Sequence, residues 1–443
     1  MRIQLSDHFT YKKLLWFTLP SIFMMIFTSI YGVVDGFFVS NFVGKTPFAA
    51  VNFIMPFLMV LGAIGFMFGT GGGALIAKTM GEGRLELANR QFSLFVYVTL
   101  VCGLVITVLA QLFLRPIMGW LGAEGELLEN CVSYGRIILL SMTPFILQFE
   151  FQSFFVTAEK PQLGLAVTVA SGVTNMVLDA LFIAVFHWGL VGAAAATALS
   201  QTVGGIVPLI YFSRKNTSLL RLTKTEYDGH SLQKACINGS SELMSNIAMS
   251  VVGMLYNVQL IKYAGEDGVA AYGVLMYVNF TFLSVFIGYS VGSAPIVSYH
   301  YGAGHWEELK GLLRKSLTII GVCSAAMFVL AELLAGPMSV VFVSYDPVLL
   351  EMTLRGFLIF SLSFLFAGLA IYGSSFFTAL NDGLTSAVIS FLRTLVFQVA
   401  AVMLLPLIWD LDGIWISCVV AELMAAVLTV WFIRKKRSRY HYA

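Results

Sequence analysis

Apolar runs of about 20 residues recur along the whole of this 443-residue chain, and each run is long enough to cross a membrane as a helix. The chain is 58% apolar and only 11% charged, whereas soluble domains carry about 25% charged residues. Backbone groups in a membrane must bond within their own segment, which favours helices. The sequence therefore predicts an all-α polytopic membrane protein without a sizeable soluble domain.

Polar breaks divide these runs into twelve expected transmembrane helices. We expect them at residues 14–40, 47–77, 91–116, 130–153, 161–186, 190–212, 235–262, 269–299, 312–341, 351–377, 383–409 and 413–433. The loops and ends on one side hold 20 of the 26 lysines and arginines, and the positive-inside rule assigns that side to the cytoplasm. We therefore expect a multi-pass protein of the cell (plasma) membrane with both termini cytoplasmic.

The two halves of the chain match each other at an offset of 221 residues, at which NFVGKTPFAAVNF (41–53) aligns with KYAGEDGVAAYGV (262–274). Six helices per copy give both copies the same orientation, so we expect a parallel repeat about an axis along the membrane normal. The predicted units are an N-lobe at 1–212, a cytoplasmic linker at 213–234, a C-lobe at 235–433 and a basic cytoplasmic tail at 434–443. Two such lobes around a central cleft are typical of transporters, and a static duplicated bundle is the alternative.

Two acidic residues, Asp35 and Asp179, stand inside apolar runs, where a carboxylate costs at least ~2.5–3.5 kcal/mol on insertion scales. Asn175 lies one helical turn before Asp179 on the same face, and Thr197 lies at a similar depth on the next helix. Their oxygen atoms suit a hard cation such as Na⁺. Alternatively, the two carboxylates share a proton, or the groups form a structural polar contact between helices. We favour a binding site for Na⁺ or H⁺.

The second half carries different polar groups, and four of them are candidates for contact with a substrate or coupling ion: Glu242, Asn257, Arg393 and Glu422. Asn257 lies next to Tyr256, the residue that the repeat aligns with Asp35. A buried Arg393 needs an acidic partner, and Glu422 is the candidate although the expected depths differ by about 10 Å. A structural ion pair and a functional site are both open interpretations of this pair.

Other residues near the predicted site bear on its shape. Pro20 removes a backbone hydrogen bond from the first helix, which permits either a hinge or a static kink. Glu150, near the inner end of the fourth helix, is expected to reach towards the membrane interface. Three aromatic residues close to Asp35 are candidates for lining a cleft that binds aromatic substrates, namely Tyr31, Phe37 and Phe38.

The stretch from Pro20 to Asp35, the run NMVLDALFI followed by GLVGAAAATALSQ, and the Gly-x-Gly turns after the second and eighth helices resemble prokaryotic members of the multidrug and toxic compound extrusion (MATE) family. The resemblance covers essentially the whole chain. It implies an antiporter that exports cationic or amphipathic organic compounds in exchange for Na⁺ or H⁺ by alternating access of a central cleft. It also implies that Asp35, Asn175, Asp179 and Thr197 form the cation site of the N-lobe.

Three other functions compete with this interpretation. A flippase for a lipid-linked precursor, from the same superfamily, is expected to have a more basic cavity. A membrane-embedded enzyme would need a metal-ligand cluster or a Ser/His pair within the spans, and a channel would not need the lobed repeat. We expect a monomer embedded in the lipid bilayer that is not an enzyme, needs no cofactor beyond its coupling ion and binds no nucleic acid.

Overall fold

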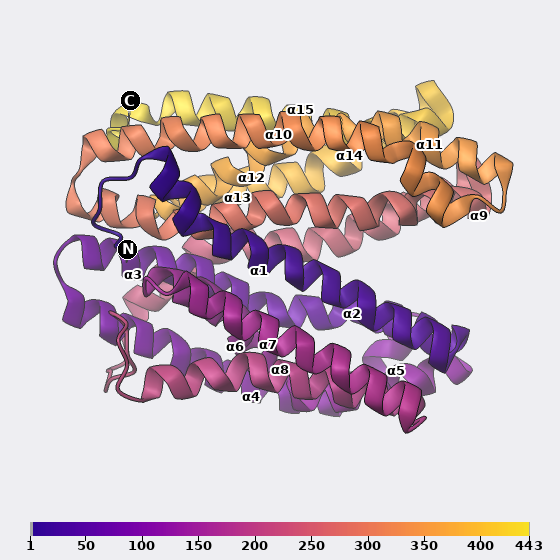
Figure 1. Cartoon of the computed structure of the whole chain (residues 1–443), viewed down its shortest axis with the longest axis horizontal. Coiled ribbons are helices and arrows are strands. Elements are labelled where there is room, and N and C mark those ends of the chain that lie inside the picture. Colours follow the sequence, from indigo (N-terminus) through magenta and orange to yellow (C-terminus); the bar gives the residue numbers. More distant parts are fainter. Residues whose placement is uncertain (1–2, 443) are drawn as a thin grey trace.

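The computed structural model describes residues 3–442, and the regular elements of this part are all helices (Figure 1). The first half contains α1 (Tyr11–Phe38), η1 (Val39–Val43), α2 (Lys45–Met67), η2 (Phe68–Gly72), α3 (Gly73–Gly81), α4 (Leu85–Trp120), α5 (Gly125–Leu140), α6 (Met142–Thr157), α7 (Pro161–Asp179), η3 (Ala180–Val185) and α8 (Gly189–Ser213), where η denotes a π-helical segment. The second half contains α9 (Gly229–Ala303), α10 (Trp306–Val343), α11 (Pro347–Ser361), α12 (Phe364–Ala379), α13 (Gly383–Phe391), η4 (Leu392–Phe397), α14 (Gln398–Leu404), α15 (Pro406–Lys435) and α16 (Arg437–Tyr440). The first two residues of the predicted N-lobe and the last residue of the predicted tail lie outside the described part.

Within residues 3–442, nine helical stretches are long and apolar enough to cross a membrane, and two bent pairs raise this number to eleven. The prediction of an all-α polytopic membrane protein is confirmed. In addition, α9 is interrupted at Gly265, whose φ of 63° and ψ of −150° are not helical. If the two parts of α9 are counted separately, the number of candidate spans in the described part is the predicted twelve. This count rests on the length and composition of the helices alone.

Several helices differ from the predicted ranges in their bends. The fourth predicted helix is split into α5 and α6 with a 59° bend around Ser141, and the tenth into α11 and α12 with a 48° bend. The predicted loop at 263–268 is helical except at Gly265. The last long helix begins earlier than predicted, and its first turn is broken at Trp409 and Asp410. Apolar composition locates a span, but it does not report the local backbone breaks within that span.

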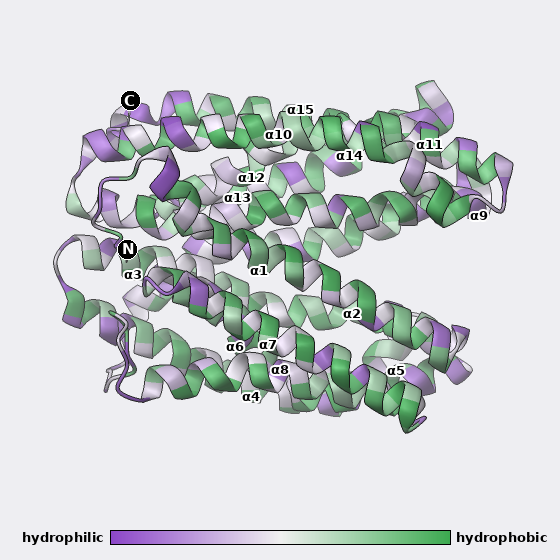
Figure 2. Ribbon diagram, in the orientation of Figure 1, coloured by the Kyte–Doolittle hydropathy of each residue, from purple (hydrophilic) through white to green (hydrophobic). Residues whose placement is uncertain are grey.

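The two halves of the chain form two groups of helices that lie side by side. In Figure 1, α2 to α8 occupy the lower part of the view and α9 to α15 the upper part, while α1 runs from the upper left into the lower part. Both termini lie at the same end. We call this end the terminal end. Hydrophobic residues dominate the middle of the helices, and hydrophilic residues gather at both ends (Figure 2). This distribution is the one expected for helices that span a bilayer.

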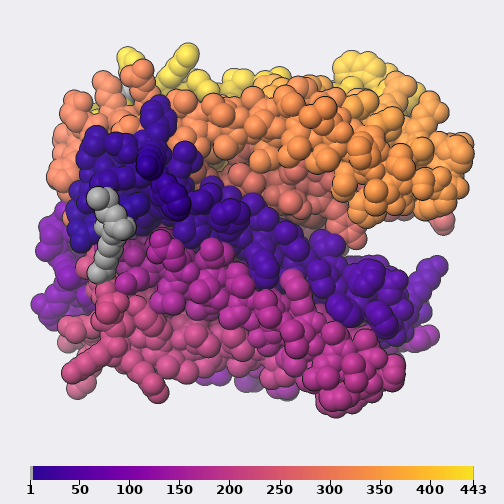
Figure 3. All heavy atoms as spheres, viewed as in Figure 1, coloured from indigo at the N-terminus to yellow at the C-terminus, as the bar shows by residue number. Residues whose placement is uncertain are grey.

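Buried apolar side chains connect the two groups at the terminal end. One core cluster combines residues of both halves with residues next to the termini, including Phe9, Phe92, Tyr289 and Tyr442. Two further clusters are each confined to one half, one around Ile54 and Ile146 and the other around Leu275 and Trp415. Figure 3 shows the two halves separated at the end opposite the termini. The molecule is therefore closed at the terminal end and open at the other.

Glycines bring the backbones of the two halves into direct contact at the terminal end. A Cβ atom added at Gly239 of α9 would lie 1.9 Å from the Met67 carbonyl oxygen, and one at Gly302 would lie 2.1 Å from the Lys78 carbonyl oxygen. Conversely, a Cβ at Gly71 would lie 2.3 Å from the Ala235 carbonyl oxygen. Any larger residue would force the helices apart. The glycine-rich run at 65–78 thus serves close helix packing, as small residues do in membranes.

The segment after the last long helix folds back onto the second half. Lys436 Nζ donates to Asp382 Oδ2 at 2.6 Å, and the Tyr442 hydroxyl donates to the Ile433 carbonyl oxygen at 2.8 Å. Burial raises the pKa of the Asp382 carboxyl group, but hydrogen bonds from Lys436 and Thr385 outweigh this effect and hold the pKa below its usual value. Lys436 therefore contributes to folding rather than only to surface charge.

Candidate functional site

The two intramembrane acids of the first half both lie next to π-helical segments. Asp35 is in the last turn of α1, directly before η1, and Asp179 is the last residue of α7, directly before η3. Both side chains are buried, with exposed fractions of 7% and 0%. A π-helical turn shifts the register of the helix and is frequent at functional sites. In this protein, α1 and α7 each end in a π-helical turn next to one of the two acids.

The four residues predicted as a cation site come together. The Asp35 carboxyl group interacts with the side chains of Asp179, Thr197 and Asn175. Asn175 Nδ2 donates to Thr197 Oγ1 at 3.4 Å, which links α7 to α8. The four residues predicted from the sequence therefore lie close together on three helices, α1, α7 and α8.

The oxygen atoms of this cluster are not satisfied by the protein. In the described part of the chain, Asp35 Oδ1, Asn175 Oδ1 and both carboxylate oxygens of Asp179 are buried without a hydrogen-bond partner. The ion pairs of residues 3–442 include neither acid. Burial of an uncompensated carboxylate is costly, so these acids need a proton or a bound cation. The geometry therefore suits a site that takes up a small positive ion.

Tyr134 of α5 is a member of this cluster that the sequence analysis missed. Its side chain is only 1% exposed, its hydroxyl group lies near Thr197, and it is within electrostatic range of Asp35 and Asp179. The Tyr134 hydroxyl has no hydrogen-bond partner in the described residues. A tyrosine in an apolar run gives no sequence signal.

The aromatic candidates near Asp35 divide into two kinds. Tyr31 points inward, because its hydroxyl group interacts with Gln148 and lies within electrostatic range of Asp35. Phe37 is 57% exposed and packs edge to face on Phe38 at 5.9 Å between ring centroids. Phe37 and Phe38 therefore belong to the surface of α1, whereas Tyr31 belongs to the polar interior of the first half.

The second half pairs its buried charges internally. Arg393 of η4 and Glu422 of α15 form a bidentate ion pair, with Nε–Oε2 and Nη2–Oε1 distances of 2.8 and 2.9 Å. The expected difference in depth between them was wrong, because the broken start of α15 and the π-helical turn of η4 change the heights counted along straight helices. Glu242 is a second acid within electrostatic range of the Arg393 guanidinium group. The charge of Arg393 is thus compensated.

The other second-half candidate, Asn257, is exposed on α9. Its neighbour Tyr256 is buried, stacks on Tyr272 at 5.3 Å, and donates its hydroxyl proton to Gln398 Oε1 at 2.7 Å. The position that the repeat aligns with Asp35 therefore holds a neutral hydrogen-bonded pair.

Glu150 does not reach the membrane interface, as the sequence had suggested. It is 0% exposed, lies beside Thr99, and both its carboxylate oxygens lack a hydrogen-bond partner in the described part of the chain. Glu150 lies in the middle of α6, and this helix is almost completely covered by its neighbours, which hold the Glu150 side chain away from the interface. Pro20 is also buried and lies within the unbroken helix α1, so its role as a hinge stays a prediction.

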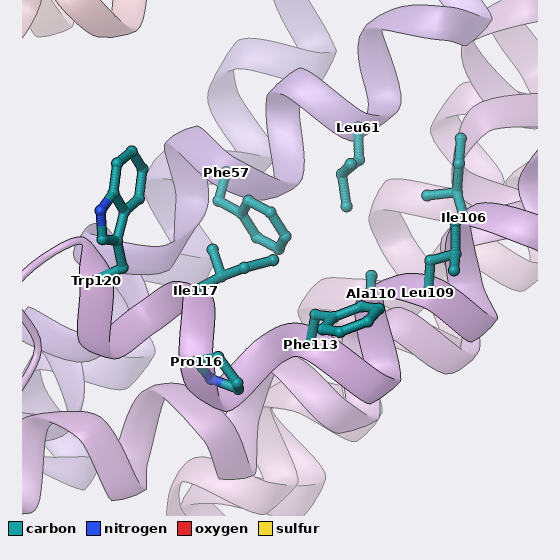
Figure 4. Close-up of a pocket in the computed structure, with 9 residues that line it drawn as sticks. All are labelled: Phe57, Leu61, Ile106, Leu109, Ala110, Phe113, Pro116, Ile117 and Trp120. Atoms are coloured by element: carbon teal, nitrogen blue, oxygen red, sulfur yellow. The ribbon is translucent and has the colours of Figure 1, made fainter.

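An apolar pocket of the first half lies away from these residues. It has a volume of about 490 Å³ and is lined only by apolar side chains of α2 and α4 (Figure 4). Phe57 and Leu61 of α2 form one wall, and Phe113 and Ile117 of α4 form the other (Figure 4). Because it offers no polar group, it is a groove in the membrane-facing surface and not an ion site.

Comparison with curated proteins identifies similar sequences over nearly the whole chain. The chain is 28% identical over 439 residues to the multidrug export protein MepA of Staphylococcus haemolyticus (strain JCSC1435), covering 97% of this chain and 94% of that protein. It is 24% identical over 438 residues to the multidrug export protein MepA of Staphylococcus aureus (strain MRSA252), covering 96% and 94%.

Solved structures share the fold. A crystal structure of a MATE protein in complex with MaL6 superposes with a TM-score of 0.93 at 22% identity, covering 98% of both chains. An outward-facing multidrug resistance MATE transporter of the MOP superfamily superposes with a TM-score of 0.92 at 22% identity, again covering 98% of both.

The family model MatE matches residues 20–181 and residues 243–404, so its second match begins 223 residues after the first, close to the offset of 221 in the predicted repeat. The first match ends in η3, just after Asp179, and the second ends with the last residue of α14. The chain therefore belongs to the MatE family, the multidrug and toxic compound extrusion family that its sequence resembles.

Proposed function

We propose that this protein is a cation-coupled antiporter that exports organic compounds in exchange for Na⁺ or H⁺. The observation that carries the proposal is the cluster of Asp35, Asn175, Asp179 and Thr197. In the described part of the chain, buried oxygens of Asp35, Asn175 and Asp179 lack hydrogen-bond partners. Membership of a transporter family supports transport over catalysis. A carboxylate pair that binds and releases a positive ion supplies the coupling step.

The proposed substrates are cationic or amphipathic drug-like compounds. The curated relatives are named multidrug export proteins, which supports this class for the present chain. The buried charges around Arg393 are in accord, since the two acids Glu242 and Glu422 lie within electrostatic range of this one guanidinium group. A surplus of negative charge favours substrates with a positive group.

The alternative of a flippase for a lipid-linked precursor is less well supported. Such a substrate carries a pyrophosphate group, for which Arg393 is the main basic residue expected within the membrane. That guanidinium group is already held by the Glu422 carboxylate through two hydrogen bonds. A bidentate carboxylate occupies the same donors that a phosphate would use.

The proposed cycle uses alternating access. The described conformation is closed at the terminal end and separated at the other, which suits loading of the cation from the open side. Cation binding lowers the affinity for substrate in the shared cleft, the substrate leaves, and the lobes rock to release the cation on the terminal side. The ion drives this change only through its different affinity for the two conformations.

We further propose that the terminal end faces the cytoplasm and that the protein acts as a monomer in the plasma membrane. Both termini lie at this end, and the loops and ends expected on this side carry most of the basic residues.

Transport by proteoliposomes with separately imposed Na⁺ and pH gradients tests the function, with a fluorescent cationic dye as the substrate. Asp35→Asn and Asp179→Asn are expected to abolish gradient-driven export while leaving the melting temperature of the protein nearly unchanged. Asp267→Asn, the same chemical change near Gly265 of α9, serves as the matched control and should retain export. Export at the wild-type rate in both Asp35→Asn and Asp179→Asn would overturn the proposal.

A further inference from the structure

A small cavity lies inside the first half, between α6, α7 and α8, and belongs to neither the cation cluster nor the apolar groove. Gln148 and Gln152 of α6, Thr168 of α7, and Gly204 and Pro208 of α8 contribute to its wall. Its volume is about 10 Å³, which is room for about one water molecule. The wall of this cavity is partly polar, because Gln148, Gln152 and Thr168 line it.

The two glutamines are buried without partners. Gln148 is 3% exposed and Gln152 is 4% exposed, and the Nε2 and Oε1 atoms of both lack a hydrogen-bond partner in residues 3–442. Buried amides are nearly always hydrogen-bonded, because an unpaired polar group in an apolar interior is costly. Two neighbouring amides that face one small cavity are the arrangement that an internal water molecule or a passing ion satisfies.

The local sequence of α8 adds a further oxygen atom to this wall. Pro208 has no backbone N–H, so the carbonyl group of Gly204, four residues earlier, lacks its helical donor. Gly204 also makes room for Gln148, because a Cβ atom at this position would lie 2.5 Å from Gln148 Cδ. The cavity therefore combines side-chain amides with a free carbonyl oxygen.

The two glutamines extend the polar region of the cation cluster towards the terminal end. Tyr31 lies one helical turn before Asp35 on α1, and its hydroxyl group lies near the Gln148 amide. Gln152 follows Gln148 by one turn, about 6 Å further along α6. The residues just beyond α6 are at the terminal end, since Glu159 Oε1 accepts a hydrogen bond from the backbone N–H of Leu5 at 2.7 Å. Polar groups thus lead from the acids towards the terminal end.

We propose that this cavity is a hydrated waypoint in an ion passage inside the first half, where Gln148, Gln152 and the Gly204 carbonyl oxygen hold the coupling cation or its water on the way from Asp35 and Asp179 to the terminal side. The proposal rests on the proposed function and names the route of its coupling ion. The cation then leaves through the interior of one lobe, while the substrate uses the cleft between the lobes.

The double variant Gln148→Leu with Gln152→Leu tests the route, because leucine fills similar space without polar atoms. In proteoliposomes we expect dye export to fall about tenfold, as for the loss of one to two hydrogen bonds to the passing ion. The fall should occur with a Na⁺ gradient, a pH gradient or both, depending on which ion is coupled. Thermal stabilisation of the purified protein by Na⁺ or by lower pH should stay unchanged, because the binding cluster is intact. Gln111→Leu on α4 is the matched control and should export normally.

Two outcomes of this experiment would overturn the waypoint. Export at the control rate under both gradients would show that the ion does not pass the glutamines. Equal loss of cation binding and export would place the glutamines in the binding cluster itself. If Asp35→Asn and Asp179→Asn retain export, the proposed function has failed; if only the glutamine variant retains it, the waypoint alone has failed.

A second measurement keeps the proposal testable if the double variant does not fold. Radiolytic labelling of the wild-type protein in detergent modifies side chains that contact bound water. Phe151 and Phe155 line the cavity, whereas Phe154 is 0% exposed and does not line it. We expect oxidation of Phe151 and Phe155 above the level of Phe154. Equal protection of all three phenylalanines would contradict a hydrated cavity.

Discussion

The buried ion pair of the second half allows a quantitative prediction, because it has two acids and one base. Removing one partner of a buried pair costs ~3–5 kcal/mol, since the other charge is left without compensation. In Arg393→Gln, both Glu422 and Glu242 lose their cation, so the full cost applies. In Glu422→Gln, Arg393 keeps Glu242 within electrostatic range, so we expect a smaller loss of about half that value.

The double variant Arg393→Gln with Glu422→Gln should be less destabilised than the sum of the two single variants by at least ~2 kcal/mol, because joint removal of a buried pair is often nearly neutral. The assay is the free energy of unfolding in mixed micelles of lipid and detergent, measured for all four proteins as a double-mutant cycle. Arg115 and Glu129, which are paired at the exposed surface, provide the control cycle, with an expected coupling below ~1 kcal/mol. A Glu422→Gln variant that is less stable than Arg393→Gln would refute the role given to Glu242.

Three further predictions address other parts of the molecule. Tyr134→Phe should weaken Na⁺ or H⁺ binding about fivefold through the loss of one hydroxyl group, with little change in melting temperature, as measured by cation-dependent thermal stabilisation. Gly239→Ala should open the terminal end, because its Cβ would meet a carbonyl oxygen of α2 at 1.9 Å; spin-label distances across that end should lengthen, while Gly253→Ala, with open space around its Cβ, should leave them unchanged. Asp382→Asn should lower the melting temperature at neutral pH, because it removes the charged carboxylate that accepts the hydrogen bond from Lys436. The folded-state pKa of Asp382 is depressed. The difference in melting temperature from wild type should therefore persist above pH ~4 and vanish as the pH falls through that lowered pKa.

The residues of the candidate site could be selected from the sequence alone. Asp35 and Asp179 were identified because a carboxylate in an apolar run is costly, and Asn175 because it lies one turn from Asp179 on the same helix face. These inferences use only the membrane environment and the helical period, which act within a single segment. The prediction that the four residues share one depth needed only the length of each helix.

Other contacts between helices were not read from the sequence. Tyr134 of α5 lies beside the cluster without any sequence signal, and the depths counted along straight helices separated Arg393 from Glu422, although η4 and the broken start of α15 lie between them and the two side chains are paired. Glu150 was expected at the interface, yet neighbouring helices cover its whole surface. Each of these outcomes depends on where one helix bends against another, and apolar composition carries no record of that.

The membrane environment, the succession of apolar helices, the family and the acids of the first half can be read from the amino-acid sequence, because hydrophobic burial and the cost of intramembrane charge operate residue by residue. The packed helices were needed to show which charges are compensated, which polar groups are left without partners, and at which end the two halves meet. Those properties arise when side chains from distant segments pack together, and close packing fixes them through backbone breaks and glycine contacts that are read only in three dimensions.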